Sequence, residues 1–281
     1  MPELSARVVV VTGGSAGIGR ATVERLVLGG ARVVTCARDG DRLADAVGAL
    51  PGVTSVTADV ADAADRVRLV EAVLSEHGRL DGVVLNAGLG WAGLVEEMPG
   101  EVVEGIVALN LTGAVELTRL ALPHLLAAAR ERGRADVVAV SSVAAWAQVP
   151  PLTVYSATKA GLAGFVKGLR REVTARGVRV HTVNPFFVET EWLARGHGHA
   201  PVSDTDAEGR LSRGIAPGRV ADRIADCLTA PRSRTISVPR WAGAARLGEV
   251  TPVNRVLDAV LSRQAGRIRA AARSAVERRT G

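Results

Sequence analysis

The chain has 281 residues, of which 47% are hydrophobic and only 3% aromatic, so its length allows a sizeable core built from aliphatic side chains. Two cysteines, Cys36 and Cys227, exclude a disulfide framework, and no uninterrupted apolar run reaches the ~18 residues of a membrane-spanning helix. The first residues show no basic and then apolar leader pattern, and we therefore expect a cytoplasmic protein.

The formal net charge of +6 is concentrated at one end of the chain. Residues 232–281 hold eleven arginines and three acidic residues, which leaves 24 basic and 26 acidic side chains in the rest. A nearly neutral body does not indicate a nucleic-acid-binding protein. Apolar residues recur at helical spacing through 253–268, opposite arginines. Three interpretations of the basic tail, residues 251–281, stay open: a helix packed on the body or a partner subunit, a membrane-surface helix, or a disordered end.

Strand and helix patterns alternate along the chain. Strands are predicted over 8–11, 32–36, 53–57, 82–85, 137–141, 178–183 and 236–238, and helices over 20–28, 63–77, 102–129 and 155–176. This alternation predicts an α/β fold, a doubly wound parallel sheet covered on both faces, in a single domain over residues 1–250. Residues 191–217 lack a clear period and are interpreted as a mobile loop or lid.

The first strand is followed by a glycine-rich turn, Thr12-Gly-Gly-Ser-Ala-Gly-Ile-Gly, which opens the first helix. Gly13 permits a sharp turn, and Gly17 and Gly19 let the backbone and the helix start approach a pyrophosphate. A purely structural strand-to-helix turn is the alternative. The position between a strand and a helix favours dinucleotide binding.

The residues after the second strand bear on the choice of cofactor. Ala37 stands where an acidic side chain would hydrogen-bond the ribose 2′-hydroxyl of NAD, and Arg38 can instead pair with a 2′-phosphate. Asp39 should point away. We therefore expect NADP(H) rather than NAD(H), the alternative being that Arg38 is a solvated surface residue.

Tyr155, the only tyrosine, precedes Lys159, one of two lysines, by four residues. On a helix these positions share one face. A nearby ammonium group favours a phenolate and lowers the pKa of the phenol. The pair therefore predicts a proton donor and acceptor that works near neutral pH.

Seven sequence features fall in the order and spacing of a known family: Thr12–Gly19, Asn86-Ala87-Gly88, Asn110, Ser141-Ser142, Tyr155, Lys159 and Asn184-Pro185. Over roughly residues 5–240 the chain resembles the short-chain dehydrogenase/reductase family, the type with a TGxxxGxG turn and a YxxxK pair. The resemblance implies a Rossmann-like fold and an NAD(P)-dependent oxidoreductase that moves a hydride between nicotinamide and a ketone or secondary alcohol.

The same resemblance implies roles for four catalytic residues. Tyr155 would be the acid/base, and Lys159 would lower its pKa and bind the nicotinamide ribose. Ser142 would hold and polarise the substrate oxygen. Asn110 would hold a water molecule that links Lys159 to solvent, whereas Ser141 is expected to be only a strand-end hydroxyl.

Contacts to the cofactor also carry over. Asp59 would bind the adenine beside Val60, and Asn86 would line the adenosine side, with turn capping as the structural alternative for Asp59 and Asn86. The expected cofactor-binding set is Gly13, Ser15, Gly17, Ile18, Gly19, Arg38, Asp59, Val60, Asn86, Ala87, Gly88, Tyr155, Lys159, Pro185, Val188 and Thr190.

The chain departs from the family pattern at two places. Phe186 and Phe187 follow Asn184-Pro185 where the family usually has glycine, which puts the position of residues 188–190 in question. The last predicted strand runs into Val238-Pro239-Arg240 instead of the usual Val-Asp-Gly-Gly turn.

Five of the seven Phe and Trp residues fall in segments that border the substrate in the family: Trp91, Trp146, Phe186, Phe187 and Trp192. They predict a hydrophobic, ring-containing ketone or secondary alcohol as substrate, unless the rings pack under loops. His197 and His199 have no third ligand nearby, so we expect no metal site.

Two other functions compete with an NADP(H)-dependent oxidoreductase. A catalytically silent dinucleotide-binding regulatory protein is disfavoured by the complete set of four catalytic residues. A sugar-nucleotide epimerase or dehydratase is disfavoured by the glycine spacing and the short chain. Helices 102–129 and 155–176 resemble the pair that forms dimers in the family, so a homodimer or homotetramer is expected.

Overall fold

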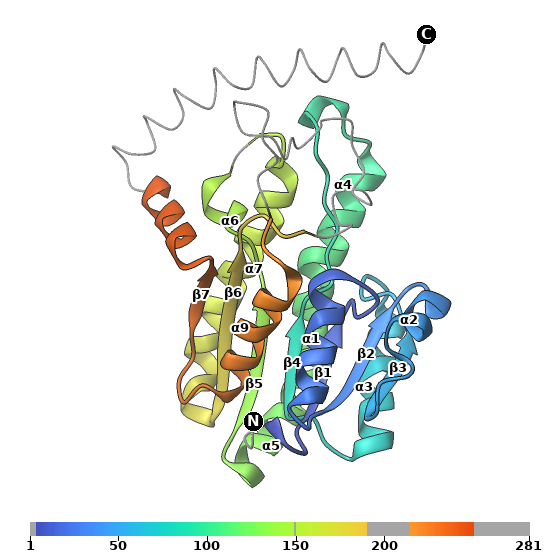
Figure 1. Cartoon of the computed structure of the whole chain (residues 1–281). Helices are drawn as coiled ribbons and strands as arrows, with labels where there is room; N and C mark the ends of the chain where they lie inside the picture. Colours follow the sequence, from blue (N-terminus) through green and yellow to red (C-terminus); the bar gives the residue numbers. More distant parts are fainter. Residues whose placement is uncertain (1–3, 149, 190–213, 250–281) are drawn as a thin grey trace.

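A computed structural model describes residues 4–148, 150–189 and 214–249, and its centre is a seven-stranded parallel sheet (Figure 1). The strand order is β3-β2-β1-β4-β5-β6-β7. The strands are β1 (Val8–Thr12), β2 (Arg32–Ala37), β3 (Val53–Thr57), β4 (Gly82–Leu85), β5 (Ala135–Val140), β6 (Val178–Pro185) and β7 (Thr235–Val238). The order reverses between β1 and β4, and ligands of such sheets bind where the strands end at this reversal.

Helices cover both faces of the sheet (Figure 1). One face carries α1 (Gly17–Leu28), α2 (Gly40–Val47) and α9 (Pro217–Thr229). The other carries α3 (Ala63–His77), α5 (Gly113–Arg132) and α7 (Thr153–Val173). The remaining elements are η2 (Val95–Glu97), α4 (Gly100–Val107), η3 (Ala108–Thr112), α6 (Ala144–Ala147), η4 (Thr174–Arg176) and η5 (Arg240–Glu249).

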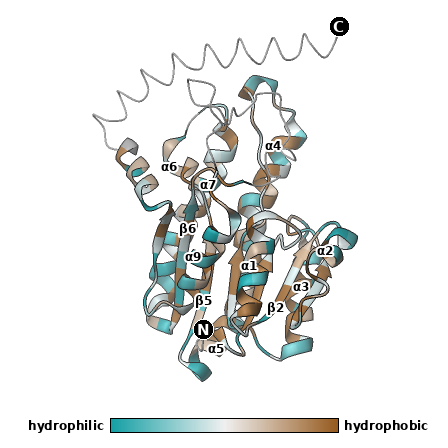
Figure 2. Ribbon diagram, in the orientation of Figure 1, coloured by the Kyte–Doolittle hydropathy of each residue, from teal (hydrophilic) through white to brown (hydrophobic). Residues whose placement is uncertain are grey.

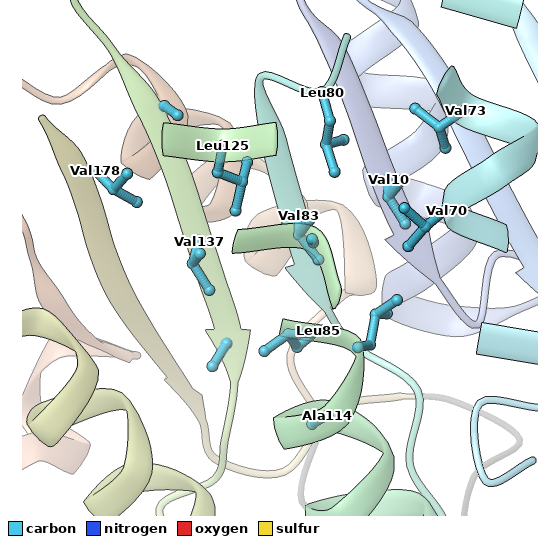
Figure 3. Close-up of a cluster of buried hydrophobic side chains, with 14 of the residues drawn as sticks. Val10, Val70, Val73, Leu80, Val83, Leu85, Ala114, Leu125, Val137 and Val178 are labelled. Carbon is cyan, nitrogen blue, oxygen red and sulfur yellow. The ribbon is translucent and has the colours of Figure 1, made fainter. Parts of the chain in front are cut away.

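The strands divide their side chains between two apolar cores. In β1, Val8 and Val10 belong to the core under α3, α5 and α7, whereas Val9 and Val11 belong to the opposite core. Figure 3 shows Leu125 of α5 beside the strand residue Val137 in the first core. Brown strands lie between helices with teal outer surfaces in Figure 2, as expected for a sheet buried on both faces.

The doubly wound α/β fold predicted from the sequence is confirmed, with one correction inside a helix. The pattern over 102–129 predicted one long helix, but α4 and α5 are separated by the π-helical turn η3, which contains Asn110. Such single π turns often mark functional sites. The helix predicted over 155–176 begins earlier, as α7, and ends in the 3₁₀ turn η4.

Three α-helices of the described residues were absent from the prediction: α2, the short α6 and α9. Asp39 caps α2 by accepting a hydrogen bond from the Arg42 amide. Pro217 begins α9, which therefore takes the last residue of the segment interpreted as a loop. The basic tail, Thr190, Trp192, His197 and His199 lie outside the described residues.

The run from Gly100 to Arg132 is long and apolar enough, by length and composition, to cross a membrane. Core helices of soluble proteins pass the same test. Within this run α5 contributes Leu117, Ala121 and Leu125 to the core, so packing on the sheet accounts for its apolar residues.

Where the strands begin, a buried ionic network fixes the edge of the sheet. Asp136 accepts hydrogen bonds from Arg7 (2.7 Å), from Arg134 (2.7 and 2.9 Å) and from His181 Nε2 (3.0 Å). Because His181 Nδ1 accepts the Arg234 amide at 3.2 Å, its proton is on Nε2. Burial lowers the pKa of His181, so the imidazole is neutral.

Candidate active site

Three of the predicted catalytic side chains meet where β5 ends. Ser142 follows β5 by two residues, and Tyr155 and Lys159 lie one turn apart at the start of α7. Tyr155 is 9% exposed and Lys159 only 4%. Ser141 holds the strand to the helix, since its hydroxyl donates to the Lys159 carbonyl at 3.0 Å. This is the structural role that the sequence predicted for it.

Ser142 forms hydrogen bonds both with Tyr155 and with the start of α6. Its side chain forms a hydrogen bond with Tyr155, and its Oγ accepts the Ala144 amide at 3.1 Å. Burial raises the pKa of Tyr155 to about 12, and the hydrogen bond with Ser142 lowers it only in part. Tyr155 is therefore protonated at neutral pH in the polypeptide, in contrast to the sequence prediction that Lys159 lowers the pKa of this phenol.

Lys159 lies beside the Tyr155 ring and is bonded to β5. The ammonium lies 5.8 Å from the centroid of the Tyr155 ring and donates to the Val140 carbonyl at 3.0 Å. Burial lowers the pKa of Lys159 to about 8. Burial thus disfavours the protonated form of the lysine whose charge was expected to act on the phenol.

Asn110 stands on the π turn and bridges two segments. Its Oδ1 accepts the Leu89 amide at 2.8 Å, while its Nδ2 donates to the Leu89 carbonyl at 2.8 Å and to Thr158 Oγ1 at 3.1 Å. The side chain is thus bound to the loop after β4 and to α7. Thr158 was missed by the sequence reasoning, although its position directly before Lys159 was a signal.

The glycine turn has the geometry expected of a phosphate-binding loop. Gly13 and Gly17 have φ values of +76° and +52°, a region that favours glycine. A side chain on Gly19 would come within 2.0 Å of the Gly13 carbonyl oxygen. The N-cap residue of α1, Ala16, makes no side-chain capping bond, so the first amides of α1 are left for another acceptor.

Asn86 joins this turn to β4. Its Nδ2 donates to the Thr12 carbonyl at 2.8 Å, and Thr12 Oγ1 accepts the amides of Asn86 and Ala87 at 2.9 Å each. Gly88 follows Ala87, and a Cβ atom added to Gly88 would lie 3.3 Å from Lys159 Nζ. The segment 86–88 therefore leaves room above the lysine, and the residues fit a bound dinucleotide.

The residues expected on the adenosine side of the cofactor site lie just after β2 and β3. Arg38 is exposed at the end of β2, and the Asp39 carboxylate is used to cap α2. Asp59 Oδ1 accepts the Ala61 amide at 2.9 Å, the turn-capping contact that was the structural alternative for this residue. Val60 is buried beside it, 6% exposed. Ser15 and Ile18 are half-buried on the glycine turn.

The predicted substrate-lining aromatic residues are not equivalent. Trp91 is only 6% exposed, and its indole packs over Gly93, which favours the packing interpretation. Trp146 is half-buried on α6. Phe186 is 51% exposed and contacts Trp241, with ring centroids 5.5 Å apart. Trp241 was missed, because nothing in its local sequence indicates this neighbour.

Hydrogen bonds hold the segment after Pro185 in place, although Phe186 and Phe187 replace the usual glycine. The Val143 amide donates to the carbonyl of the buried Pro185 at 3.0 Å, and the Ile215 amide donates to the Phe187 carbonyl at 2.9 Å. Val188 forms a parallel bridge with Ile215. These contacts place Val188, whereas Thr190, which was expected to bind the cofactor, is outside the described residues.

Comparison with known proteins agrees with this geometry. The model of the family "short chain dehydrogenase" matches residues 7–197. The putative ketoacyl reductase 1 of the granaticin polyketide synthase of Streptomyces violaceoruber is 34% identical over 76% of this chain and 81% of its own length. The L-fucose dehydrogenase of Mus musculus is 40% identical over 74% of this chain and 76% of its own length.

Solved structures give the same result. The 3-ketoacyl-(acyl-carrier-protein) reductase of Brucella melitensis complexed with NADH has a TM-score of 0.75 and 28% identity, covering 84% of this chain and 99% of its own. RhlG of Pseudomonas aeruginosa in its NADP active-site complex has a TM-score of 0.75 and 27% identity, covering 85% and 97%. The chain belongs to the short-chain dehydrogenase/reductase family and is an NAD(P)-dependent oxidoreductase of that family.

Proposed function

We propose that this enzyme reduces a ketone to a secondary alcohol with NADPH, using Tyr155 as the proton donor. The observation that carries the proposal is the hydrogen bond between Ser142 and Tyr155. It places two hydroxyl groups side by side where β5 ends and α7 begins, and a single carbonyl oxygen can accept from both.

Ser142 would hold and polarise the carbonyl. Its oxygen accepts the Ala144 amide, and its proton, engaged with Tyr155 in the free enzyme, would turn to the substrate oxygen. Tyr155 is protonated at neutral pH, because burial raises its pKa to about 12, and this is the state needed to protonate a carbonyl oxygen. This protonation state supports the reducing direction.

Lys159 would replace the proton that Tyr155 gives up. With a pKa of about 8 it is mostly protonated at neutral pH and close to the value at which a proton moves in either direction. The nicotinamide, when bound, supplies the hydride. Asn110 would keep the loop at Leu89 in place beside the lysine.

The preference for NADPH rests on the end of β2. Arg38 is exposed and can pair with a 2′-phosphate, and Asp39 is occupied as the cap of α2. Ala37 supplies no carboxylate for a ribose hydroxyl. The neighbouring structures contain NADH or NADP, so the support comes from these residues rather than from the relatives.

The substrate we propose is hydrophobic around its carbonyl. Phe186 and Trp146 flank the segments that carry Ser142 and Pro185. Two of the similar proteins are named as a putative ketoacyl reductase of a polyketide synthase and as a 3-oxoacyl-[acyl-carrier-protein] reductase. We further propose a cytoplasmic homodimer or homotetramer assembled through α5 and α7. Light scattering on the purified protein would test the assembly.

A cofactor and substrate screen tests the proposal. NADPH and NADH consumption would be followed across aromatic, aliphatic and sugar ketones and aldehydes. We expect the highest kcat/KM with NADPH and an apolar ketone. Small sugars as the best substrates would overturn the substrate class, and tighter binding of NADH would overturn the cofactor preference.

A further inference from the structure

One exposed cation has no part in the chemistry proposed above. The guanidinium of Arg246, on η5, lies over the ring of Trp146, on α6, at 4.1 Å from the ring centroid. In Figure 1 α6 lies above the edge where the strands end, and the red helix of η5 continues from the end of β7 at the same edge. Two segments almost a hundred residues apart in sequence therefore meet beside the site.

Trp146 is close to the predicted carbonyl-binding serine. The Ala145 amide donates to the Ser142 carbonyl at 3.2 Å, and the Trp146 amide donates to the Val143 carbonyl at 3.0 Å. Ser142 and Trp146 are thus separated by about one helical turn, roughly 5 Å of rise, which puts the Arg246 guanidinium on the order of 10 Å from Ser142.

A second contact fixes η5 at this position. Trp241 packs against Phe186, and the Phe186 amide donates to the Val238 carbonyl at 2.8 Å. Both rings are largely exposed, Trp241 at 68% and Phe186 at 51%. An apolar surface therefore continues from the end of β6 to the helix that presents Arg246.

Acidic residues are scarce in the segments around Arg246, although Glu249 follows it by three residues on η5. Residues 137–171, 173–188 and 227–248, which supply α6, most of α7, the end of β6 and most of η5, include no Asp or Glu. Within the part of the chain that the structure describes, no carboxylate forms an ion pair with Arg246. Contact with an aromatic face leaves the N–H groups in the plane of a guanidinium available to an acceptor.

We propose that Arg246, held on Trp146, binds an anionic oxygen group, a carboxylate or a phosphate, at the end of the substrate remote from its carbonyl. The substrate is then amphiphilic, with an apolar part along Phe186 and Trp241 and an anionic terminus at Arg246. This inference rests on the proposed ketone reduction and narrows its substrate class.

Paired substrates test the assignment. Methyl-ketone carboxylic acids of increasing chain length would be compared with their methyl esters, and keto-alkyl phosphates with the corresponding alcohols. We expect the wild type to prefer the anionic member by about tenfold in kcat/KM at the best chain length, the size of one charge-assisted hydrogen-bonded contact. The two arms show whether a carboxylate or a phosphate is preferred.

Substitutions test whether the preference for anionic substrates depends on Arg246 itself or on the overall positive charge of the protein. Arg246→Gln is expected to bring the ratio of anionic to neutral substrate close to one, and Arg246→Lys to keep part of the preference. Arg176→Gln removes an exposed arginine of η4 at the opposite edge of the sheet and is expected to leave the ratio unchanged. A wild-type preference for the ester, or a ratio unchanged in Arg246→Gln, would overturn the assignment.

Failure of the proposed function gives a different result. If the wild type reduced none of these ketones with NADPH or NADH, the reaction assigned to the site would be wrong. In that case, the role of Arg246 can still be tested by calorimetry, which measures the affinity of the keto acid for wild type and for Arg246→Gln. Equal affinity of both proteins, or no binding to either, would refute the role of Arg246.

Discussion

Asn110 Nδ2 lies 3.1 Å from Thr158 Oγ1, and the same hydroxyl donates to the Tyr155 carbonyl at 2.7 Å. The π turn is thereby connected to the first turn of α7 through one threonine. Both polar atoms of the Asn110 side chain are engaged, because Oδ1 accepts the Leu89 backbone N–H and Nδ2 donates to the Leu89 carbonyl. We expect Thr158 to be a positioning residue that acts through Asn110 and Tyr155.

Thr158→Val therefore removes a bridge without a change in shape. Asn110 Nδ2 loses a buried acceptor, at a cost of about 1–3 kcal/mol, and the loop at Gly88 above Lys159 loses support. We expect kcat to fall roughly tenfold. The alkaline limb of the pH–rate profile should move, because the surroundings of Lys159 change. Thr158→Ser should restore both values, and a profile identical to wild type in Thr158→Val would show a purely structural role.

Lys159 is expected to reduce the stability of the free enzyme. Burial lowers its pKa from 10.5 to about 8, so the folded state opposes its charge. This penalty is complete below pH 8, where both states are protonated. It declines as the folded protein loses the proton first between pH 8 and 10.5, and it is absent above.

Lys159→Met should therefore be inactive and yet more stable at neutral pH, by roughly 1–3 kcal/mol after loss of the bond to Val140. Urea unfolding on either side of pH 8, without cofactor, measures the difference. The gain should shrink as the pH rises. A variant less stable than wild type at pH 7 would show that the ammonium is well solvated or better paired than its burial indicates.

Asp136 should be required for stability. Asp136→Asn leaves Arg7 and Arg134 without their carboxylate in a buried position, and a loss of about 3–5 kcal/mol is expected. Although burial raises the pKa of this carboxyl, the bonds from His181 and Arg134 outweigh it and lower the pKa. The stabilisation is therefore present above the usual pKa of an aspartate and is lost as the pH falls below it.

The control for Asp136 is the exposed ion pair between Asp222 and Arg25. Asp222→Asn should cost under about 1 kcal/mol. Because Asp136 lies at the edge where the strands begin, kcat/KM of Asp136→Asn should be preserved at temperatures where it is folded. Equal unfolding free energies for both variants would contradict the importance of the buried network.

Arg38 should determine which nicotinamide cofactor is used. In Arg38→Ala we expect kcat/KM for NADPH to fall by at least about tenfold, since an ion pair with a phosphate is lost, while the value for NADH stays within a few-fold. Arg32→Ala, an exposed arginine at the other end of β2, is the matched control. A loss shared equally by both cofactors would indicate that Arg38 does not read the 2′-phosphate.

Local pattern was sufficient for most of the fold. Valine-rich strands buried on both faces stand out as short apolar runs, and the seven predicted strands all occur. The helix α9 was missed because its apolar residues, Val220, Ala221, Ile224 and Leu228, follow a segment rich in Gly, Pro and His that obscured the period. The π turn was missed because its residues continue the helical pattern of α4 and α5 without a breaker.

The site was predictable where the residues act as a motif, and less so where they depend on distant contacts. Ser142, Tyr155 and Lys159 do converge, but the pKa of Tyr155 is raised, not lowered, because burial cannot be read from the spacing of two side chains. Arg246 over Trp146 depends on the path of the chain after β7, and no local signal in either segment indicates it.

The central claim is that the Tyr155 hydroxyl delivers the proton to a carbonyl oxygen. The most direct measurement is the kcat/KM of ketone reduction by Tyr155→Phe beside wild type at neutral pH, with cofactor affinity and circular dichroism measured on both. Phenylalanine removes only the hydroxyl, so folding and cofactor binding should persist while turnover falls by at least about 100-fold. Turnover within a few-fold of wild type, in a folded variant that binds NADPH, would contradict the mechanism.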